Sequence, residues 1–136
     1  MKAYISISHS KRKALDKELS AIKTALVKLN IDPFVFVDNY TFGASQERKM
    51  MEQAAADIDH CDILIAETSD KRIGIGIEVG YAEAKTKPII YLRHKNADHS
   101  TTASGISDFQ IIYEDIPDLQ KQLEDILTKA IKQLEK

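Results

Sequence analysis

Strand-like segments alternate with helix-like segments along this whole chain. Five short runs are rich in β-branched and aromatic residues, and between them apolar residues recur at a spacing of three and four, which is typical of a helix with one buried face. The expected strands span residues 2–8, 33–37, 62–67, 88–92 and 109–113, and the expected helices span 15–29, 45–59, 77–85 and 117–134. Strands alternating with helices require a parallel sheet covered on both faces. The pattern predicts an α/β fold, a flavodoxin-like three-layer sandwich with a parallel five-stranded sheet.

Length and charge limit the partners of such a fold. A chain of 136 residues that is 43% hydrophobic suits one compact domain, expected over residues 1–136. A net charge of -2 without a long Lys/Arg run predicts no nucleic acid and no membrane surface as partner. No apolar run approaches the roughly 20 residues of a membrane span, and the chain opens on a strand pattern rather than a signal peptide. With Cys61 as its single cysteine, the chain is expected to be cytoplasmic.

The loops that follow the strands are the expected walls of a ligand site. In a parallel sheet these loops meet at one edge, here as residues 8–10, 38–43, 67–76 and 93–105. The third loop is the most informative, because it leads from an acid that ends a strand, through glycines, to Glu78 at the start of an expected helix. Gly74 and Gly76 are expected to let the backbone approach a ligand, and Gly80 to let the helix pack closely on its neighbours.

Glu78 has two interpretations at this position. A carboxylate in the first turn of a helix is stabilised by the helix dipole, which is a structural role. The same dipole would hold Glu78 ionised at neutral pH, as a nucleophile that attacks a sugar carbon requires. The spacing of Gly74, Gly76 and Gly80 fits neither the dinucleotide fingerprint nor a phosphate loop, so no cofactor is expected. The four histidines show no ligand-like spacing, so no metal is expected.

The loop after the fourth strand is long, polar and rich in hydroxyl groups. Loops of this kind often close over a ligand, and a surface excursion is the alternative. Two aromatic residues in the second loop, Tyr40 and Phe42, would either stack on a base or pack on their own domain. Cys61 precedes a buried strand and is expected to be a core residue rather than a nucleophile.

The central segment of the chain resembles the nucleoside 2-deoxyribosyltransferase family, especially its branch of 2'-deoxynucleoside 5'-phosphate N-hydrolases. The resemblance lies in residues 61–84, CDILIAETSDKRIGIGIEVGYAEA, and in Lys87-Pro88-Ile89-Ile90. In that family a glutamate in Glu-x-Gly-x-Ala is the nucleophile, which implies this role for Glu78. The resemblance and the loop positions together give the expected substrate-binding residues: Tyr4, Ser8, Asp38, Glu67, Gly74, Gly76, Thr102 and Ser104.

The chain departs from the family pattern at three positions. The family's second carboxylate falls near Ala54, and Glu52 or Asp57 would replace it only with a shift. In the nucleotide hydrolases, a serine in the Gly-x-Gly loop and an arginine in the first loop help to hold the 5'-phosphate. The position of that serine is Arg72 here, and the position of that arginine is Ser10.

The resemblance implies a small-molecule nucleoside or nucleotide as substrate, and a homo-oligomer. Cleavage of the N-glycosidic bond would proceed through a covalent deoxyribosyl group on Glu78. Candidate groups for protonating the departing base are Asp38, Glu67 and Asp70. Glu52 and Asp57, which would need a shift in the alignment, are further candidates. Water would then complete hydrolysis, or a second base would complete transfer.

A second resemblance gives two alternative functions. Residues 4–10, YISISHS, together with residues 35–38 and 58–62, are similar to TIR domains. Some of those domains hydrolyse the glycosidic bond of NAD with a glutamate, and others only mediate protein assembly. The alternatives are therefore an NAD glycohydrolase and a non-catalytic nucleotide-binding or interaction module.

Overall fold

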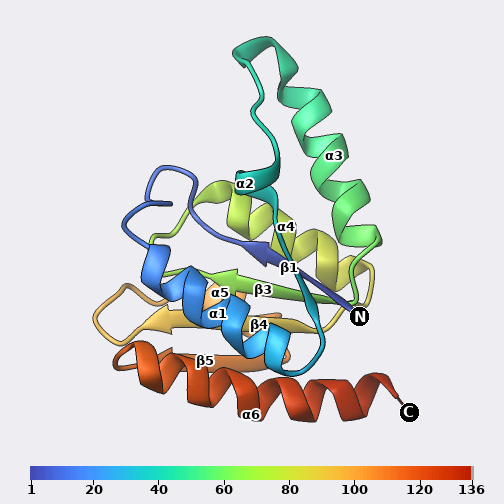
Figure 1. The fold of residues 1–136 in the computed structure, drawn as a ribbon. Helices are drawn as coiled ribbons and strands as arrows, with labels where there is room; N and C mark the ends of the chain where they lie inside the picture. Colours follow the sequence, from blue (N-terminus) through green and yellow to red (C-terminus); the bar gives the residue numbers. More distant parts are fainter. Residues whose placement is uncertain (136) are drawn as a thin grey trace.

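The computed structural model describes residues 1–135 as a parallel sheet of five strands with helices on both faces (Figure 1). The strands are β1 (Lys2–Ser6), β2 (Asp32–Val35), β3 (Ile63–Glu67), β4 (Ile89–His94) and β5 (Phe109–Tyr113). The helices are α1 (Asp16–Lys28), α2 (Phe36–Asn39), the short 3-10 helix η1 (Ala44–Gln46), α3 (Glu47–Asp59), α4 (Ile73–Ala84), α5 (Thr101–Gly105) and α6 (Ile116–Leu134). The predicted α/β sandwich is confirmed.

The strand order places a ligand crevice beside β1. The sheet runs β2-β1-β3-β4-β5, and Tyr4 of β1 lies opposite Phe34 of β2 on one side and Leu64 of β3 on the other. Because the chain leaves β1 in one direction across the sheet and β3 in the other, their following loops separate at the carboxyl edge. The topology therefore leaves room for a ligand between the loop after β1 and the loop after β3.

Side chains alternate between the two faces of the sheet. Ile5 and Ile65 point into the larger apolar layer, which also contains Leu19 of α1 and Leu123 of α6. Tyr4, Leu64 and Ala66 point into the second layer, which contains Val79 of α4. The alternation assigns every strand residue to one face, so it decides which polar side chains lie near α4.

A truncation in the larger layer tests the packing between α6 and the sheet. Leu123 is fully buried, so Leu123→Ala should lower the free energy of unfolding by about 2–5 kcal/mol, the usual cost of a large cavity. Leu134 lies on the same helix and is 40% exposed, so Leu134→Ala should change the free energy by less than about 1 kcal/mol. Urea unfolding of both variants measures the difference, and equal midpoints would contradict the layer assignment.

Helix α4 begins earlier than the sequence predicts. It starts at Ile73 rather than Ile77, so Gly74 and Gly76 lie within the helix and not in a loop. Glycine is unfavourable in a helix by roughly 1 kcal/mol, which is why the pattern predicted a loop. Burial of Ile75 against the sheet outweighs that preference. Glu78 is consequently the sixth residue of the helix and not part of its first turn.

Other boundaries also differ from the predicted ones. Strand β1 ends at Ser6, and β2 ends at Val35, directly before α2 begins at Phe36. The polar segment after β4 is anchored rather than free: α5 forms within it, Ala103 is buried, and the Arg93 guanidinium donates to the carbonyls of His94, Lys95 and Ala97. Short capping and side-chain interactions of this kind leave little trace in the hydrophobic pattern.

Residues 36–59, here called the α2–α3 arm, extend beyond the edge of the sheet (Figure 1). Helix α3 packs against α4, and the ring centroids of Phe36 and Tyr40 lie 5.1 Å apart, with Phe42 5.6 Å from Tyr40. Tyr40 and Phe42 thus pack on their own domain, which is one of the two alternatives expected for them.

Within residues 1–135, no helix has the length and apolar character needed to cross a membrane.

Candidate active site

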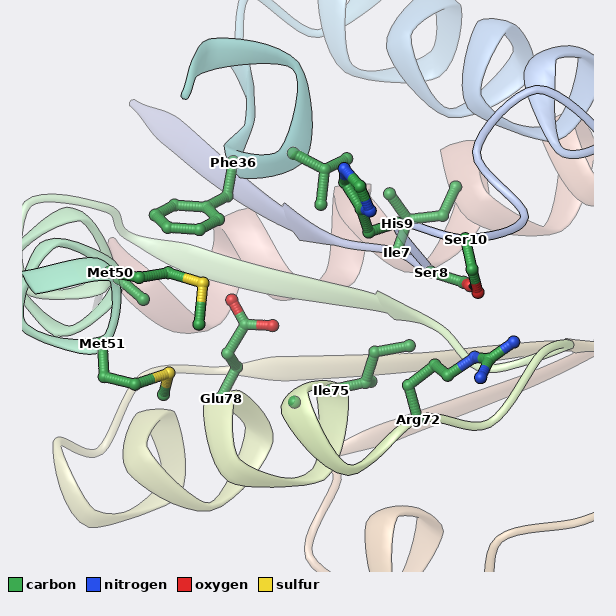
Figure 2. A pocket seen from close by; sticks show the side chains of 13 residues that line it. Ile7, Ser8, His9, Ser10, Phe36, Met50, Met51, Arg72, Ile75 and Glu78 are labelled. Atoms are coloured by element: carbon green, nitrogen blue, oxygen red, sulfur yellow. Dashed lines mark hydrogen bonds between the residues drawn. The ribbon is translucent and has the colours of Figure 1, made fainter. Parts of the chain in front are cut away.

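A cavity of about 300 Å³ lies at the carboxyl end of β1. Its walls come from the loop after β1, the α2–α3 arm and the first turns of α4 (Figure 2). Phe36, Met50 and Met51 lie at one end, and Ser8, Ser10 and Arg72 lie at the other. The cavity thus has an apolar end and a polar end, and Figure 2 shows the Glu78 carboxylate between them.

Two hydroxyl groups of β1 hold the Glu78 carboxylate. Ser6 Oγ donates to Oε1 at 2.8 Å, and the Tyr4 hydroxyl donates to Oε2. Tyr4 and Ser6 are two residues apart in the strand, so both side chains face α4. Both are buried, which fixes the two donors and therefore the carboxylate they hold. The carboxylate has one defined orientation, into the cavity.

Burial raises the pKa of Glu78, and the hydrogen bonds from Tyr4 and Ser6 oppose this shift only in part. This differs from the expectation that the helix dipole keeps the group ionised. The dipole acts mainly within the first turn, and Glu78 lies beyond it. The ionised fraction of Glu78 therefore depends on the two hydroxyl groups of β1.

A single carboxylate joins the two loops at the polar end. Ser8 Oγ donates to Asp70 Oδ2 at 2.6 Å, and Arg72 Nε donates to the same oxygen at 2.8 Å. These two hydrogen bonds hold the pKa of Asp70 below its usual range. Ser10 Oγ lies 3.3 Å from Ser8 Oγ. The loops after β1 and β3 are thus linked through side chains that reach the cavity.

Three of the expected substrate-binding residues lie close to Glu78. Tyr4 contacts its carboxylate, and Ser8 and Gly74 line the same cavity. A Cβ added at Gly74 would meet no atom within 4 Å, so the space beside this glycine on the cavity wall is open. Gly80 likewise has no neighbour within 4 Å of an added Cβ, so its expected role in close helix packing is wrong within this chain.

Three expected substrate-binding residues do not line this cavity. Gly76 and Thr102 line a neighbouring one of about 330 Å³, which also contains Lys71 and Thr68. Ser104 lines neither cavity, and its carbonyl accepts a hydrogen bond from Gln110. Formation of α5 within the predicted loop accounts for this difference, because the helix fixes the direction of each hydroxyl group.

Asp38 does not line the cavity either. Its carboxylate forms a two-pronged ion pair with Arg12, with 2.7 Å between Nε and Oδ1 and 2.8 Å between Nη2 and Oδ2. This ion pair holds the pKa of Asp38 below its usual range and ties the loop after β1 to α2. In this structure the carboxylate of Asp38 is therefore engaged by Arg12 and lies outside the cavity that contains Glu78.

Glu67 lies on the opposite face of the sheet from Glu78. It is fully buried, with Oε2 accepting from the Tyr113 hydroxyl at 2.7 Å and Oε1 from the Ser69 N–H at 2.6 Å. Tyr113 belongs to the larger apolar layer with α1 and α6. Odd-numbered residues of β3 face away from α4, so Glu67 does not line the cavity that contains Glu78.

The burial of Glu67 predicts how its replacement changes the pH dependence of stability. Burial raises its pKa above the ordinary value of 4.5, so the folded protein binds this proton more tightly than the unfolded chain. The contribution of Glu67 to stability is therefore lost as pH rises from about 4.5 through its folded pKa. Urea midpoints of Glu67→Gln, relative to the wild type, should rise with pH over this window.

The exposed pair of Glu124 and Lys28 gives the matched control for that experiment. Lys28 lies 3.0 Å from Glu124 and lowers the pKa of Glu124, so this carboxylate contributes stability above its unfolded pKa. Urea midpoints of Glu124→Gln, relative to the wild type, should fall with rising pH. A pH-independent difference for Glu67→Gln would contradict the burial argument.

The expected position of the second carboxylate is apolar in the structure. Ala54 lines the cavity, and Glu52 is exposed. Asp57 lies farther along α3, where Oδ1 accepts from Gln53 at 3.1 Å and the buried Oδ2 has no partner among residues 1–135. Glu78 is therefore the one carboxylate among the residues that line this cavity.

Ser6, Phe36, Met50 and Met51 are site residues that the sequence analysis missed. Ser6 could have been found from strand alternation, because it shares a face with Tyr4 and Ser8. Phe36 had no such signal, since it was assigned to a strand.

Burial raises the pKa of the Cys61 thiol to about 11, in keeping with a core residue. Residues 1–135 show no group of three His, Cys, Asp or Glu side chains placed to hold a metal ion.

The fold and the site define a class of protein: a parallel α/β protein with one partly buried carboxylate facing a cavity at the point where the strand order reverses. The particular family follows from the sequence. The family described as "Nucleoside 2-deoxyribosyltransferase" matches residues 6–125, and the chain belongs to this family.

Known proteins resemble this chain in sequence and in fold. A protein of Syntrophotalea carbinolica named "Putative 2'-deoxynucleoside 5'-phosphate N-hydrolase 1" is 35% identical over 76 residues, which is 54% of each chain, so the match spans about half the relative's length. A CMP N-glycosidase from Clostridium botulinum covers 91% of this chain and 98% of its own, with 21% identity and a TM-score of 0.66. A 2-deoxyribosyltransferase from Bacillus psychrosaccharolyticus covers 90% and 96%, with 19% identity and a TM-score of 0.71. The two structures share the fold.

Proposed function

We propose that this protein cleaves or transfers at the N-glycosidic bond of a (deoxy)nucleoside or nucleoside 5'-monophosphate, with Glu78 as the nucleophile. One observation carries the proposal: two fixed hydroxyl groups hold the Glu78 carboxylate so that it points into a cavity with an apolar and a polar end. Membership of the deoxyribosyltransferase family supports the reaction class. The names of the Syntrophotalea relative and of the Clostridium CMP N-glycosidase are in keeping with it.

The two ends of the cavity suit the two ends of such a substrate. Phe36, Met50 and Met51 offer apolar and polarizable surface to a flat base. Ser8, Ser10 and Arg72 offer hydroxyl and guanidinium groups to a 5'-hydroxyl or 5'-phosphate. A substrate bound in this direction places its sugar beside Glu78, which lies between the two ends.

The chemistry takes two displacements at the anomeric carbon of the sugar. Ionised Glu78 attacks this carbon while the bond to the base nitrogen breaks, and the bonding electrons leave with the base, which takes up a proton. Water or a second base then attacks the same carbon and releases Glu78 as a carboxylate. Attack by water requires loss of a proton to solvent and completes hydrolysis, whereas attack by a base nitrogen completes transfer.

The pKa of Glu78 gives this mechanism a distinctive pH dependence. Only the carboxylate form attacks, and burial raises the pKa of this group. The rate should therefore increase with pH through a value above the ordinary 4.5. The cavity contains no second carboxylate among the described residues that could protonate the departing base.

Product analysis tests the proposed reaction. The protein is incubated with deoxynucleosides, ribonucleosides, their 5'-monophosphates and NAD, each with and without an added base, and the products are separated by chromatography. We expect base release or base exchange from a nucleoside or its monophosphate. Release of nicotinamide alone would favour the NAD alternative, and no product from any substrate would contradict an enzymatic function.

A trapped adduct tests the covalent step. A substrate with an electron-withdrawing substituent on its sugar slows the second displacement, and intact-protein mass spectrometry then detects the sugar bound to the chain. Peptide mapping should locate the adduct on Glu78. Glu83 lies exposed on the same helix, so Glu83→Gln should retain the adduct and Glu78→Gln should lose it.

A further inference from the structure

We propose that Asp70 is a positioning residue that presents Arg72 and Ser8 to the 5'-phosphate of a nucleoside monophosphate. The inference rests on the proposed function and deepens it, because it names the substrate class and a residue that selects it. Asp70 does not itself line the cavity that contains Glu78. It acts through the two cavity-lining side chains that it holds.

The geometry shows how Asp70 fixes both groups. One oxygen, Oδ2, accepts from Ser8 Oγ at 2.6 Å and from Arg72 Nε at 2.8 Å. Ser8 belongs to the loop after β1 and Arg72 to the loop after β3, so one carboxylate joins the two walls of the polar end. Ser8 Oγ also accepts from the Lys11 N–H at 3.2 Å, which further restricts this hydroxyl group.

The remaining donors of Arg72 suit a phosphate. Its Nε is bonded to Asp70, while its terminal nitrogens make no hydrogen bond within residues 1–135. Figure 2 shows the guanidinium beside Ser8 and Ser10 at the polar end. A guanidinium edge with two free nitrogens binds a phosphate through two parallel hydrogen bonds. A neutral 5'-hydroxyl would use at most one of them.

The exposure of Arg72 explains why it needs a partner. The side chain of Arg72 is 48% exposed and that of Asp70 is 28% exposed. A long exposed side chain loses rotamer freedom when it binds a ligand, and a pre-formed ion pair reduces that loss. Without Asp70, Arg72 would sample solvent-directed rotamers and Ser8 would lose its acceptor. The cations Lys11 and Arg72 both lower the pKa of Asp70, so two positive charges lie near this carboxylate at the polar end.

Four variants test the role of Asp70: Asp70→Ala, Asp70→Asn, Arg72→Met and the double variant Asp70→Ala/Arg72→Met. For each one, KM and kcat are measured with a nucleoside 5'-monophosphate and with the matching nucleoside. We expect Asp70→Ala to raise KM for the monophosphate about tenfold and to change KM for the nucleoside less than about threefold. Arg72→Met should act in the same way, and the double variant should lose less than the two single losses combined, because both changes remove the interaction between Asp70 and Arg72.

Two further comparisons separate positioning from charge and from folding. Asp70→Asn keeps an oxygen that accepts from Arg72 and should restore most of the loss. Asp98→Asn makes the same charge change at an exposed residue that lines neither cavity, and should leave both KM values unchanged. Urea unfolding confirms that each variant is folded. Equal losses for both substrates, or a lower KM for the monophosphate in Asp70→Ala, would overturn the proposal.

Binding measurements distinguish this inference from the proposed function. Calorimetric titration of the Glu78→Gln protein with the monophosphate and with the nucleoside reports affinity without turnover. Tighter binding of the monophosphate that depends on Asp70 would support the inference even if no base is released by the wild type. Equal affinity for the two ligands would overturn it, whatever the activity assay shows.

Discussion

Replacing Glu78 by Gln should lower turnover by at least about 10³-fold, a loss of the size seen when a catalytic nucleophile is removed. The new amide is not a usable nucleophile, because its oxygen attacks an anomeric carbon far more weakly than a carboxylate does. The side chain keeps its shape, and its oxygen still accepts a hydrogen bond from Tyr4 or Ser6. Glu83→Gln, on the exposed side of the same helix, should keep wild-type turnover.

The same substitution should make the protein more stable at neutral pH. Burial raises the pKa of Glu78 above 4.5, so the folded state loses stability as pH rises through the folded pKa. A glutamine does not ionise and avoids that loss. Urea midpoints measured between about pH 5 and about pH 8 should therefore separate in favour of Glu78→Gln as pH rises. Full turnover in this variant would contradict the assignment of the nucleophile.

Tyr4→Phe should lower kcat/KM near neutral pH by about 10- to 100-fold. It removes the hydroxyl group that donates to Glu78 Oε2 and leaves that oxygen without this partner in a buried place. Because hydrogen bonds to the charged form lower a pKa, their loss should raise the pKa of Glu78 further. The rising limb of the pH–rate profile should therefore move to higher pH.

Tyr113→Phe is the matched control for Tyr4→Phe. Tyr113 is also buried and also donates to a carboxylate, but that carboxylate is Glu67 on the other face of the sheet. This variant should lower the free energy of unfolding by about 1–3 kcal/mol and leave the pH–rate profile in place. If the two variants changed the profile equally, Tyr4 would act through stability and not through Glu78.

The sequence was sufficient to predict the sheet, its order of elements and a place for Glu78 at the carboxyl edge of the sheet, because these depend on repeated patterns. Apolar periodicity identifies strands and helices, and the carboxyl edge of a parallel sheet is fixed once the strands are known. The predicted start of α4 was wrong, since the low helix propensity of Gly74 and Gly76 indicates a loop. Burial of Ile75 decides the matter, and burial is a tertiary property.

The acids of the chain were harder to assign than its strands. Glu67 and Glu78 were both predicted to be site residues. Because side chains alternate along a strand, Glu67 faces the layer that contains Tyr113. Asp38 lies in a loop after a strand, as a binding residue would, yet it pairs with Arg12. The role of Asp70 depends on the approach of two loops that are far apart in sequence, which no local pattern reports.

In the proposed reaction, the α2–α3 arm would recognise the base, while β1 and α4 would carry the chemistry of the sugar. Phe36, Met50 and Met51 belong to this arm, whereas the donors that hold Glu78 belong to the central strand β1. Methionine side chains are flexible and adapt to ligands of different outline. In the proposed reaction, substitutions along the arm would therefore exchange one preferred base for another, while the reacting carboxylate and its two hydroxyl partners stay unchanged. A family built on this plan can diversify its substrates without rebuilding its catalytic group.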